Sequence, residues 1–227
     1  GDAYSISKGH YLSLDNPIPI NPMMLPYSET QIADMIKESI NQVVALAASN
    51  LILTVGMSDL IDDAIKECLR KNRKSLLHVR DYLAAMKFGR AETREGILSR
   101  LNFLLSDEKI EKIICGNKAI DIGKLIRNGE TLIVDCFGMS REKMIFVGSL
   151  ITQMVKSYFR YDKQTEYKPL SLYIDECHNF LNPNIADILK EGRRYKLSCC
   201  LATQDFALID EKITRLMLNT GNIISYR

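Results

Sequence analysis

The chain has 227 residues, of which 46% are hydrophobic, so it can bury one sizeable core, or one core with a smaller lobe. Thirty Lys and Arg against 28 Asp and Glu give a formal net charge of +2, which is too balanced to indicate a nucleic-acid surface by electrostatics alone. The six cysteines have no CxxC spacing and lie mostly in apolar runs, so they indicate neither a zinc site nor a disulfide framework, and reduced, cytosolic thiols are the simplest account of them.

Residues 1–27 are predicted to form a short strand followed by an extended connector. The strand candidate covers 11–14. Pro17, Pro19 and Pro22 follow closely, and prolines at this spacing forbid regular structure because each fixes its backbone and lacks an N–H donor. The first residues show no basic-then-apolar signal pattern.

Residues 28–128 are predicted to form a mostly helical lobe. Ser28 and Gln31 match a capping box that opens a helix reaching about residue 48. The most apolar segment, 43–57, is interrupted by polar residues and too short to span a bilayer, so we expect no part of the chain to enter a membrane. Further helical periodicity covers 59–71, 76–86, 95–105 and 109–114.

In residues 129–227, short apolar runs alternate with amphipathic helices, an order typical of an α/β domain with a parallel sheet and right-handed crossovers. The predicted strands cover 131–135, 170–175, 197–202 and 222–226, and the predicted helices lie near 144–158, 185–194 and 211–218. Asp135, Asp175 and Gln204 stand at the ends of three of these strands. Because the carboxyl ends of parallel strands meet at one edge of a sheet, we expect a nucleotide to lie there.

Asp175 and Glu176 are the most informative pair in the chain. They end a run of mainly apolar residues, as in a buried parallel strand that delivers carboxylates to the edge where open α/β sheets bind ligands. Asp175 is then suited to hold a Mg²⁺ shell, and Glu176 to orient a water molecule. The alternative is that both acids mark a helix start, where the helix dipole favours negative charge.

The glycine-rich loop that a nucleotide motor needs for the phosphates is absent from the sequence. None of the 12 glycines belongs to a GxxxxGK[ST] pattern, and the single Gly-Lys pair, at Gly123, is followed by a leucine. Either this loop precedes Gly1 in a longer protein, or the chain is not a working ATPase. The end at Arg227, just where a predicted strand finishes, favours a piece of a longer protein.

Several segments resemble the HerA/FtsK-superfamily ATPases, above all those of type IV secretion and conjugation. In the second half they are Asp175-Glu176, the Glu-Gly-Arg-Arg-Tyr-Lys-Leu stretch 191–197, Leu-Ala-Thr-Gln at 201–204 and the stretch 221–227. In the first half, Gly1-Asp2 resembles the end of the family segment after the P-loop helix, Asn21-Pro22 its Asn-Pro connector, and 99–107 with 119–122 the exit from its lobe.

This resemblance implies a fold and a set of residue roles. The fold would be a RecA-like parallel sheet, a partial motor core made of 1–27 and 129–227, with 28–128 as the inserted helical lobe. Asp175 would be the Walker B acid that coordinates Mg²⁺, and Glu176 the base that orients the attacking water. Gln204 would read the γ-phosphate, and Arg193 would be the finger that reaches a neighbouring subunit's ATP.

The resemblance also implies partners and a location. The parent would be a homo-oligomer, a hexamer, that passes DNA through a central channel and meets secretion-channel or relaxase partners. It would be cytoplasmic, or the cytoplasmic domain of a protein anchored in the inner membrane. The chain alone is predicted to be inactive as an ATPase because it lacks the phosphate loop.

The residues leave other interpretations open. Asp175 to His178 spell a DExH box, and Leu-Ala-Thr at 201–203 mimics the Ser-Ala-Thr motif of superfamily 2 helicases, although the 191–195 motif has no helicase counterpart. In the coupling-ATPase interpretation, His178 is expected to be a solvated first-turn residue. A HerA-type DNA-repair translocase and a non-catalytic scaffold module are further alternatives. In purely structural interpretations, Arg193 complements a helix C-terminus and Gln204 caps a turn.

Overall fold

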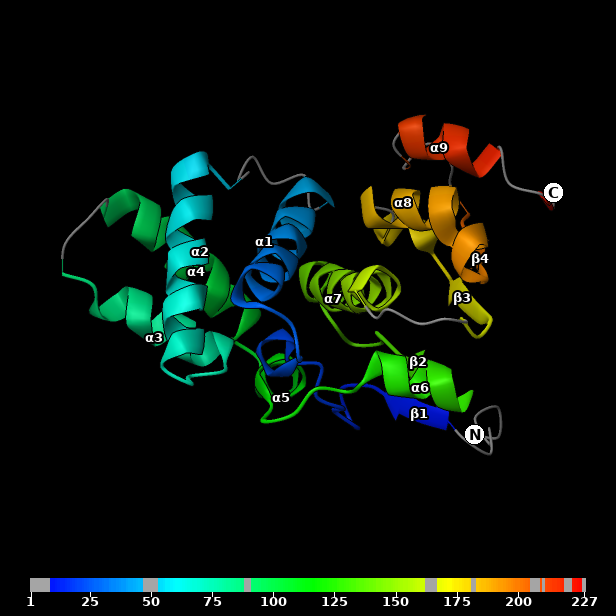
Figure 1. Cartoon of the computed structure of the whole chain (residues 1–227). Coiled ribbons are helices and arrows are strands. Elements are labelled where there is room, and N and C mark those ends of the chain that lie inside the picture. The colour runs from blue at the N-terminus through cyan, green and yellow to red at the C-terminus, as the bar shows by residue number, and fades with distance from the viewer. Residues whose placement is uncertain are drawn as a thin grey trace. The chain divides into compact units, whose positions relative to one another are not determined.

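The computed structural model of the chain describes residues 9–46, 53–87, 91–161, 167–180, 183–204, 209, 211–218 and 222–225 (Figure 1). The chain divides into two compact units, one made of Gly1–Asp121 with Glu130–Ile151 and the other of Ile122–Gly129 with Thr152–Arg227. Among the described residues, each unit contains one pair of parallel strands. The fold is therefore mixed α/β with short parallel sheets, and the single RecA-like parallel sheet that the resemblance implies stays a prediction.

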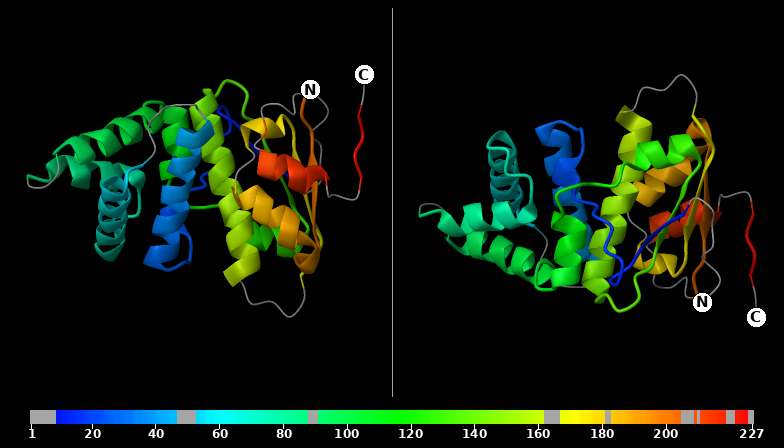
Figure 2. Two further views of the ribbon diagram at one scale, coloured as in Figure 1. Left: turned by 90° about the horizontal axis from the view of Figure 1, so that it is seen from above. Right: turned by 90° about the horizontal axis from the view of Figure 1, so that it is seen from below.

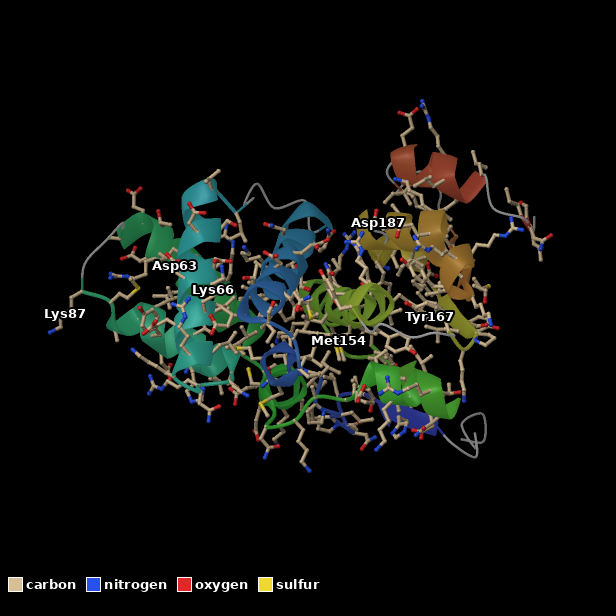
Figure 3. All side chains as sticks on the ribbon, viewed as in Figure 1. Asp63, Lys66, Lys87, Met154, Tyr167 and Asp187 are labelled. Atoms are coloured by element: carbon tan, nitrogen blue, oxygen red, sulfur yellow. The ribbon has the colours of Figure 1, made fainter. Side chains whose placement is uncertain are left out.

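The first unit holds the helical lobe. Its helices are α1 (Glu29–Leu46), α2 (Val55–Arg70), α3 (Leu76–Ala85), α4 (Ala91–Leu104) and α5 (Glu108–Cys115). Helix α1 packs against α2, and α2, α3 and α4 pack against one another (Figure 2). Isoleucines and leucines such as Ile36, Ile61 and Leu101 are fully buried in this lobe. Lys66, labelled in Figure 3, forms an ion pair of 2.6 Å with Asp62 on α2.

Helix α1 begins with the capping box that the sequence predicts. The Gln31 N–H donates to Ser28 Oγ at 3.3 Å, and the Ser28 N–H donates to Gln31 Oε1 at 2.9 Å. Thr54, Ser75 and Asp107 cap α2, α3 and α5 in the same way, with side-chain oxygens that accept backbone N–H groups.

The proline-rich connector is held by Asn21. Its fully buried side chain donates to the carbonyl oxygens of Lys74 at 2.9 Å and Gly116 at 2.8 Å, and accepts the Met23 N–H at 3.0 Å. These bonds fasten an irregular segment to the loops of the helical lobe, and a short 3-10 turn, η1 (Pro22–Met24), follows at once.

Strand β1 (Gly9–Leu12) pairs in parallel with β2 (Thr131–Val134), in the register Gly9 to Thr131. The helical lobe is thus the crossover between these strands. Strand β1 begins two residues before the predicted strand at 11–14. Part of the family resemblance rests on Gly1 and Asp2, which lie outside the described residues.

The second unit holds α6 (Ile122–Asn128), the later part of α7 (Arg141–Tyr161), β3 (Leu170–Ile174), η2 (Cys177–Asn179), α8 (Pro183–Glu191), η3 (Gly192–Tyr195), β4 (Leu197–Leu201) and α9 (Glu211–Leu218). Strands β3 and β4 pair in parallel over all five residues. The prediction of a strand at 222–226 is wrong for the described residues 222–225, which have no regular structure. Ile223 and Ile224 are exposed there. Tyr226 and Arg227 lie outside the described residues. None of the helices within the described residues combines the length and the apolar composition needed to cross a bilayer.

Candidate functional site

The paired strands β3 and β4 bring two of the predicted site residues to the same end of a sheet. The register places Ile174 opposite Leu201, and the pairing continues beyond it, because the Ala202 N–H donates to Ile174 O at 2.9 Å and the Cys177 N–H donates to Ala202 O at 2.8 Å. Asp175 directly follows β3, Gln204 is the third residue after β4, and both are exposed. The loops after the two strands therefore form one bonded edge.

Asp175 and Glu176 have different local environments at this edge. One oxygen of Asp175, Oδ1, accepts the Glu176 N–H at 3.0 Å. Glu176 has φ +45° and ψ 48°, in the left-handed region, and its side chain is 39% exposed. A non-glycine residue in this region is uncommon and costs on the order of 1 kcal/mol, and such strain gathers at active sites.

His178 lies closer to the site than the sequence suggests. Its Nδ1 stands 3.4 Å from Glu176 Oε2 and 3.2 Å from Thr203 Oγ1, and its side chain is only 15% exposed. The expectation that His178 is a solvated first-turn residue is wrong. The chain turns sharply at Glu176 into a 3-10 turn instead of entering a long helix, and this turn directs the imidazole toward the loop after β4.

Arg193 lies on the 3-10 turn η3, which interrupts the helix predicted at 185–194. A Cβ added at Gly192 would stand 3.0 Å from the Leu197 carbonyl oxygen, so the turn is tightly folded on the start of β4. Lys196 ends the turn with φ +56°. The two arginines differ, because Arg194 lies over the Tyr195 ring at 5.7 Å, whereas Arg193 is exposed and has no recorded polar partner among the described residues.

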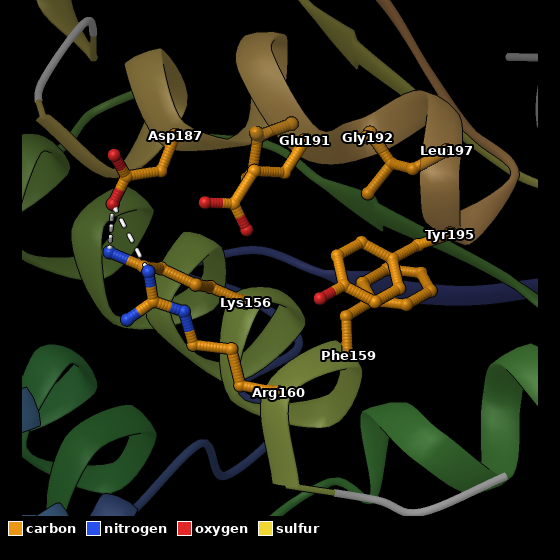
Figure 4. Close-up of a pocket in the computed structure, with 9 residues that line it drawn as sticks. Lys156, Phe159, Arg160, Asp187, Glu191, Gly192, Tyr195 and Leu197 are labelled. Carbon is orange, nitrogen blue, oxygen red and sulfur yellow. Dashed lines mark ion pairs between the residues drawn. The ribbon is translucent and has the colours of Figure 1, made fainter.

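Aromatic packing fixes this turn against the later part of α7. The Tyr195 ring lies 5.4 Å from the Phe159 ring and 5.3 Å from the Tyr167 ring, measured between centroids. Tyr195 and Phe159 also line a pocket whose other side holds Asp187, which forms ion pairs with Lys156 at 2.6 Å and with Arg160 at 3.6 Å (Figure 4). We interpret this pocket as part of the packing that supports η3.

Asp135, the third predicted strand end, belongs to the first unit. It follows β2, accepts a hydrogen bond from the Tyr11 hydroxyl and accepts the Phe137 N–H at 2.8 Å. The hydrogen bond from Tyr11 is the larger of two causes that lower the pKa of Asp135 below its ordinary value, and the bond from the Phe137 N–H is the other. Asp175 and Gln204 share a sheet edge, and the convergence of Asp135 with them stays a prediction.

The residues at the β3–β4 edge fit part of a magnesium site. Mg²⁺ is commonly held by one or two carboxylates together with substrate phosphates and water molecules. The exposed Asp175, with Oδ1 occupied by the Glu176 N–H, has Oδ2 left for such a role. Within the described ranges, no group of three His, Cys, Asp or Glu side chains is arranged to hold a metal alone, so phosphates would have to supply further ligands.

Neither a protein-family model nor a curated protein matches the sequence. Among solved structures, the bacterial conjugative coupling protein TrwBdeltaN70, in its unbound monoclinic form, is similar with a TM-score of 0.63 and 16% identity, over 94% of this chain and 56% of that chain. VirB4 of Thermoanaerobacter pseudethanolicus has a TM-score of 0.63 and 12% identity, over 92% of this chain and 60% of that one. The plasmid coupling protein TrwB in complex with ADP and Mg²⁺ has a TM-score of 0.63 and 15% identity, over 94% and 57%.

These similarities concern the fold. The chain spans between 56% and 60% of the length of the solved structures named above. Nearly all of it, helical lobe and strand pairs alike, follows their architecture. The resemblance to the conjugative type IV secretion ATPases that the sequence motifs indicate is confirmed at the level of fold.

Proposed function

We propose that this chain is the later part of an oligomeric, ATP-driven motor of the conjugative type IV secretion kind, which moves DNA or feeds substrate into a secretion channel. The main support is the joint position of Asp175, Glu176 and Gln204 at the bonded carboxyl edge of β3 and β4. A parallel sheet binds its ligand at this edge. The fold is shared with TrwB, a coupling protein that has been solved in complex with ADP and Mg²⁺.

In this proposal each residue has one task in a RecA-like core. Asp175 holds the metal of Mg·ATP through its remaining oxygen, and Glu176 orients the attacking water. Gln204, exposed beyond β4, contacts the γ-phosphate. The metal itself neutralises charge on the phosphates. The phosphate loop belongs to sequence before Gly1 in a longer protein, which is cytoplasmic or carries a membrane anchor.

The position of Arg193 supports a finger that acts in trans. Arg193 precedes β4, whereas Asp175 and Glu176 follow β3, and the two strands are parallel, so arginine and acids lie at opposite ends of the pair. Five strand residues span about 16 Å, a distance longer than an extended arginine side chain. Arg193 therefore serves the nucleotide of an adjacent protomer, as in a ring, and a hexamer with DNA in its centre is the arrangement we propose.

The first test separates catalysis from a structural acid pair. In the longer protein with its phosphate loop, Glu176→Gln should leave Mg·ATP binding nearly intact while hydrolysis falls by about 10²-fold or more, because water orientation is lost and the metal ligand is kept. Asp175→Asn should weaken Mg·ATP binding itself. Steady-state hydrolysis and calorimetric titration measure the two effects. A Glu176→Gln variant with the parent rate would show that the pair is structural.

The second test concerns the subunit arrangement. Arg193→Ala should lower turnover by about 10³-fold and spare nucleotide affinity, as for other fingers. Arg194→Ala is the matched control, since Arg194 is stacked on Tyr195, and we expect it to keep turnover within a few-fold. Mixing inactive Arg193→Ala and Glu176→Gln subunits should restore some hydrolysis at interfaces where both residues are intact. Mixed oligomers, confirmed by mass, that stay inactive would favour a helicase-like or scaffold role.

A further inference from the structure

His178 connects the two loops of the candidate site through a single atom. Its Nδ1 stands 3.4 Å from Glu176 Oε2 and 3.2 Å from Thr203 Oγ1. The imidazole is largely enclosed, with 15% of its side chain exposed, whereas the Glu176 side chain is 39% exposed. The imidazole is therefore held by its surroundings, and its contact restricts the position of the more exposed carboxylate.

Hydrogen-bond chemistry limits what this atom can do. A ring nitrogen that carries a proton can donate to the carboxylate or to the hydroxyl, or share the proton between them. A ring nitrogen without a proton accepts from the Thr203 hydroxyl and repels the carboxylate. The proximity of Glu176 thus favours the tautomer with the proton on Nδ1, which is the form that holds the acid.

The backbone ties the partners of His178 together. Cys177, fully buried, donates its N–H to Ala202 O at 2.8 Å, so the turn that carries His178 is bonded to the residue before Thr203. Glu176 itself has a left-handed backbone, which directs its side chain away from the path of a regular strand or helix. A shift of the loop after β4 would therefore change the position of Glu176, both through the backbone hydrogen bond and through the imidazole.

We propose that His178 is a positioning residue, which holds the Glu176 carboxylate in place for catalysis and couples it to Thr203, the neighbour of Gln204. This inference rests on the proposed ATPase function. It explains why an enclosed histidine lies between an acid assigned to water orientation and a loop assigned to γ-phosphate contact. Nucleotide-dependent movement at Gln204 would then change how Glu176 is held, so that hydrolysis depends on the state of both loops.

The test in the longer, phosphate-loop-containing protein uses three substitutions at this link. His178→Phe should lower kcat by roughly 10- to 100-fold, the usual effect of a misplaced catalytic group, while KM for Mg·ATP changes by less than about threefold. His178→Asn, whose amide nitrogen lies near the position of Nδ1, should restore part of kcat. Thr203→Val should lower kcat less, and the double variant His178→Phe with Thr203→Val should be no slower than His178→Phe alone.

His10 provides the matched control. It makes the same type of contact, from Nε2 to Glu130 Oε2 at 2.7 Å, on β1, within the other compact unit of the chain. His10→Phe should leave kcat and KM unchanged. In the 227-residue chain itself, nitrogen NMR should show that Thr203→Val and Glu176→Gln shift the Nδ1 resonance of His178 and leave the ring of His10 unaffected.

The outcomes separate the two proposals. If Glu176→Gln abolishes hydrolysis but both His178→Phe and Thr203→Val keep the parent kcat, the positioning role is overturned and the ATPase proposal stands. If Glu176→Gln itself keeps the parent rate, the ATPase proposal fails first. If His178→Phe does not fold, Thr203→Val alone tests the positioning role. An unchanged kcat together with an unchanged Nδ1 resonance of His178 in that variant would overturn the coupling of His178 to Thr203.

Discussion

At the scale of single residues, the left-handed Glu176 predicts a conflict between stability and function. At φ +45° a Cβ is unfavourable, and glycine is the residue that avoids this cost. The free energy of unfolding of Glu176→Gly should therefore be about 1 kcal/mol higher than that of Glu176→Ala. Both variants lack the carboxylate, and only the alanine variant keeps the Cβ. Urea denaturation of the two variants measures this difference. Equal midpoints would show that the turn carries no backbone strain.

The cysteines provide a second residue-scale prediction. Burial raises the pKa of Cys177 to about 11 and that of Cys199 to about 12. The thiolate is the reactive form, so at pH 8 only about one Cys177 thiol in 10³ is ionised. An aromatic disulfide reagent should modify the exposed Cys200 first, and the rate at Cys177 should rise as the pH approaches its pKa. Cys200→Ser should remove the fast phase, and a fast phase that persists would contradict this order.

At the scale of secondary-structure elements, the capping box of α1 predicts that loss of the Ser28 hydroxyl lowers the free energy of unfolding. Ser28→Ala removes the acceptor of the Gln31 N–H and should lower the free energy of unfolding by about 1 kcal/mol. Ser28→Asp is the control, because its carboxylate accepts the same N–H and suits the positive end of the helix dipole. Thermal and urea unfolding of the three proteins test this. An alanine variant as stable as the parent would mean that α1 is held by packing alone.

Helices with a long stretch of periodic apolar residues could be predicted from the sequence, and elements that depend on contacts between distant residues could not. Helix α9 has the predicted bounds, and α1 to α5 lie near theirs. The apolar stripe of α8 stops at Ile188, and the following Gly192 folds against Leu197, which lies beyond the reach of a periodicity argument. Helix α6, with seven residues and a glycine, is too short to show a period. Residues 222–225 have the apolar composition of a strand but pair with no strand among the described residues.

The same distinction applies to the candidate site. The acids at the end of β3 could be predicted, because an apolar run that ends in two carboxylates has a clear pattern. The expectation that this strand is buried is wrong, since its residues are half-buried or exposed and Tyr173 is 76% exposed. The position of His178 could not be predicted, since its contact with Thr203 joins residues 25 positions apart through a turn that no local pattern indicates. The exposed Arg193 could be selected only through the family resemblance, and the structure adds the contrast with the stacked Arg194.

At the scale of the whole molecule, the missing phosphate loop predicts weak nucleotide binding. Without backbone N–H groups around the phosphates, the 227-residue chain should bind Mg·ATP no better than millimolar, an affinity of only about 4 kcal/mol. Calorimetric titration of the chain, with the longer phosphate-loop-containing protein as control, measures the difference. Micromolar affinity of this chain alone would contradict the assignment of the phosphate loop to sequence outside it.

The pairing of β1 with β2 has a consequence for synthesis of the protein. Tyr11 and Asp135, which are hydrogen-bonded at the end of this pair, stand 124 positions apart. At roughly 5 to 20 residues per second, a ribosome needs on the order of 6 to 25 s to make the chain between them. During that interval the helical lobe can fold, while Leu12, fully buried in the finished protein, has no partner strand. The nascent chain therefore leaves Leu12 without the strand that covers it until the lobe and then β2 have been made, so β1 is among the last elements to be completed during synthesis.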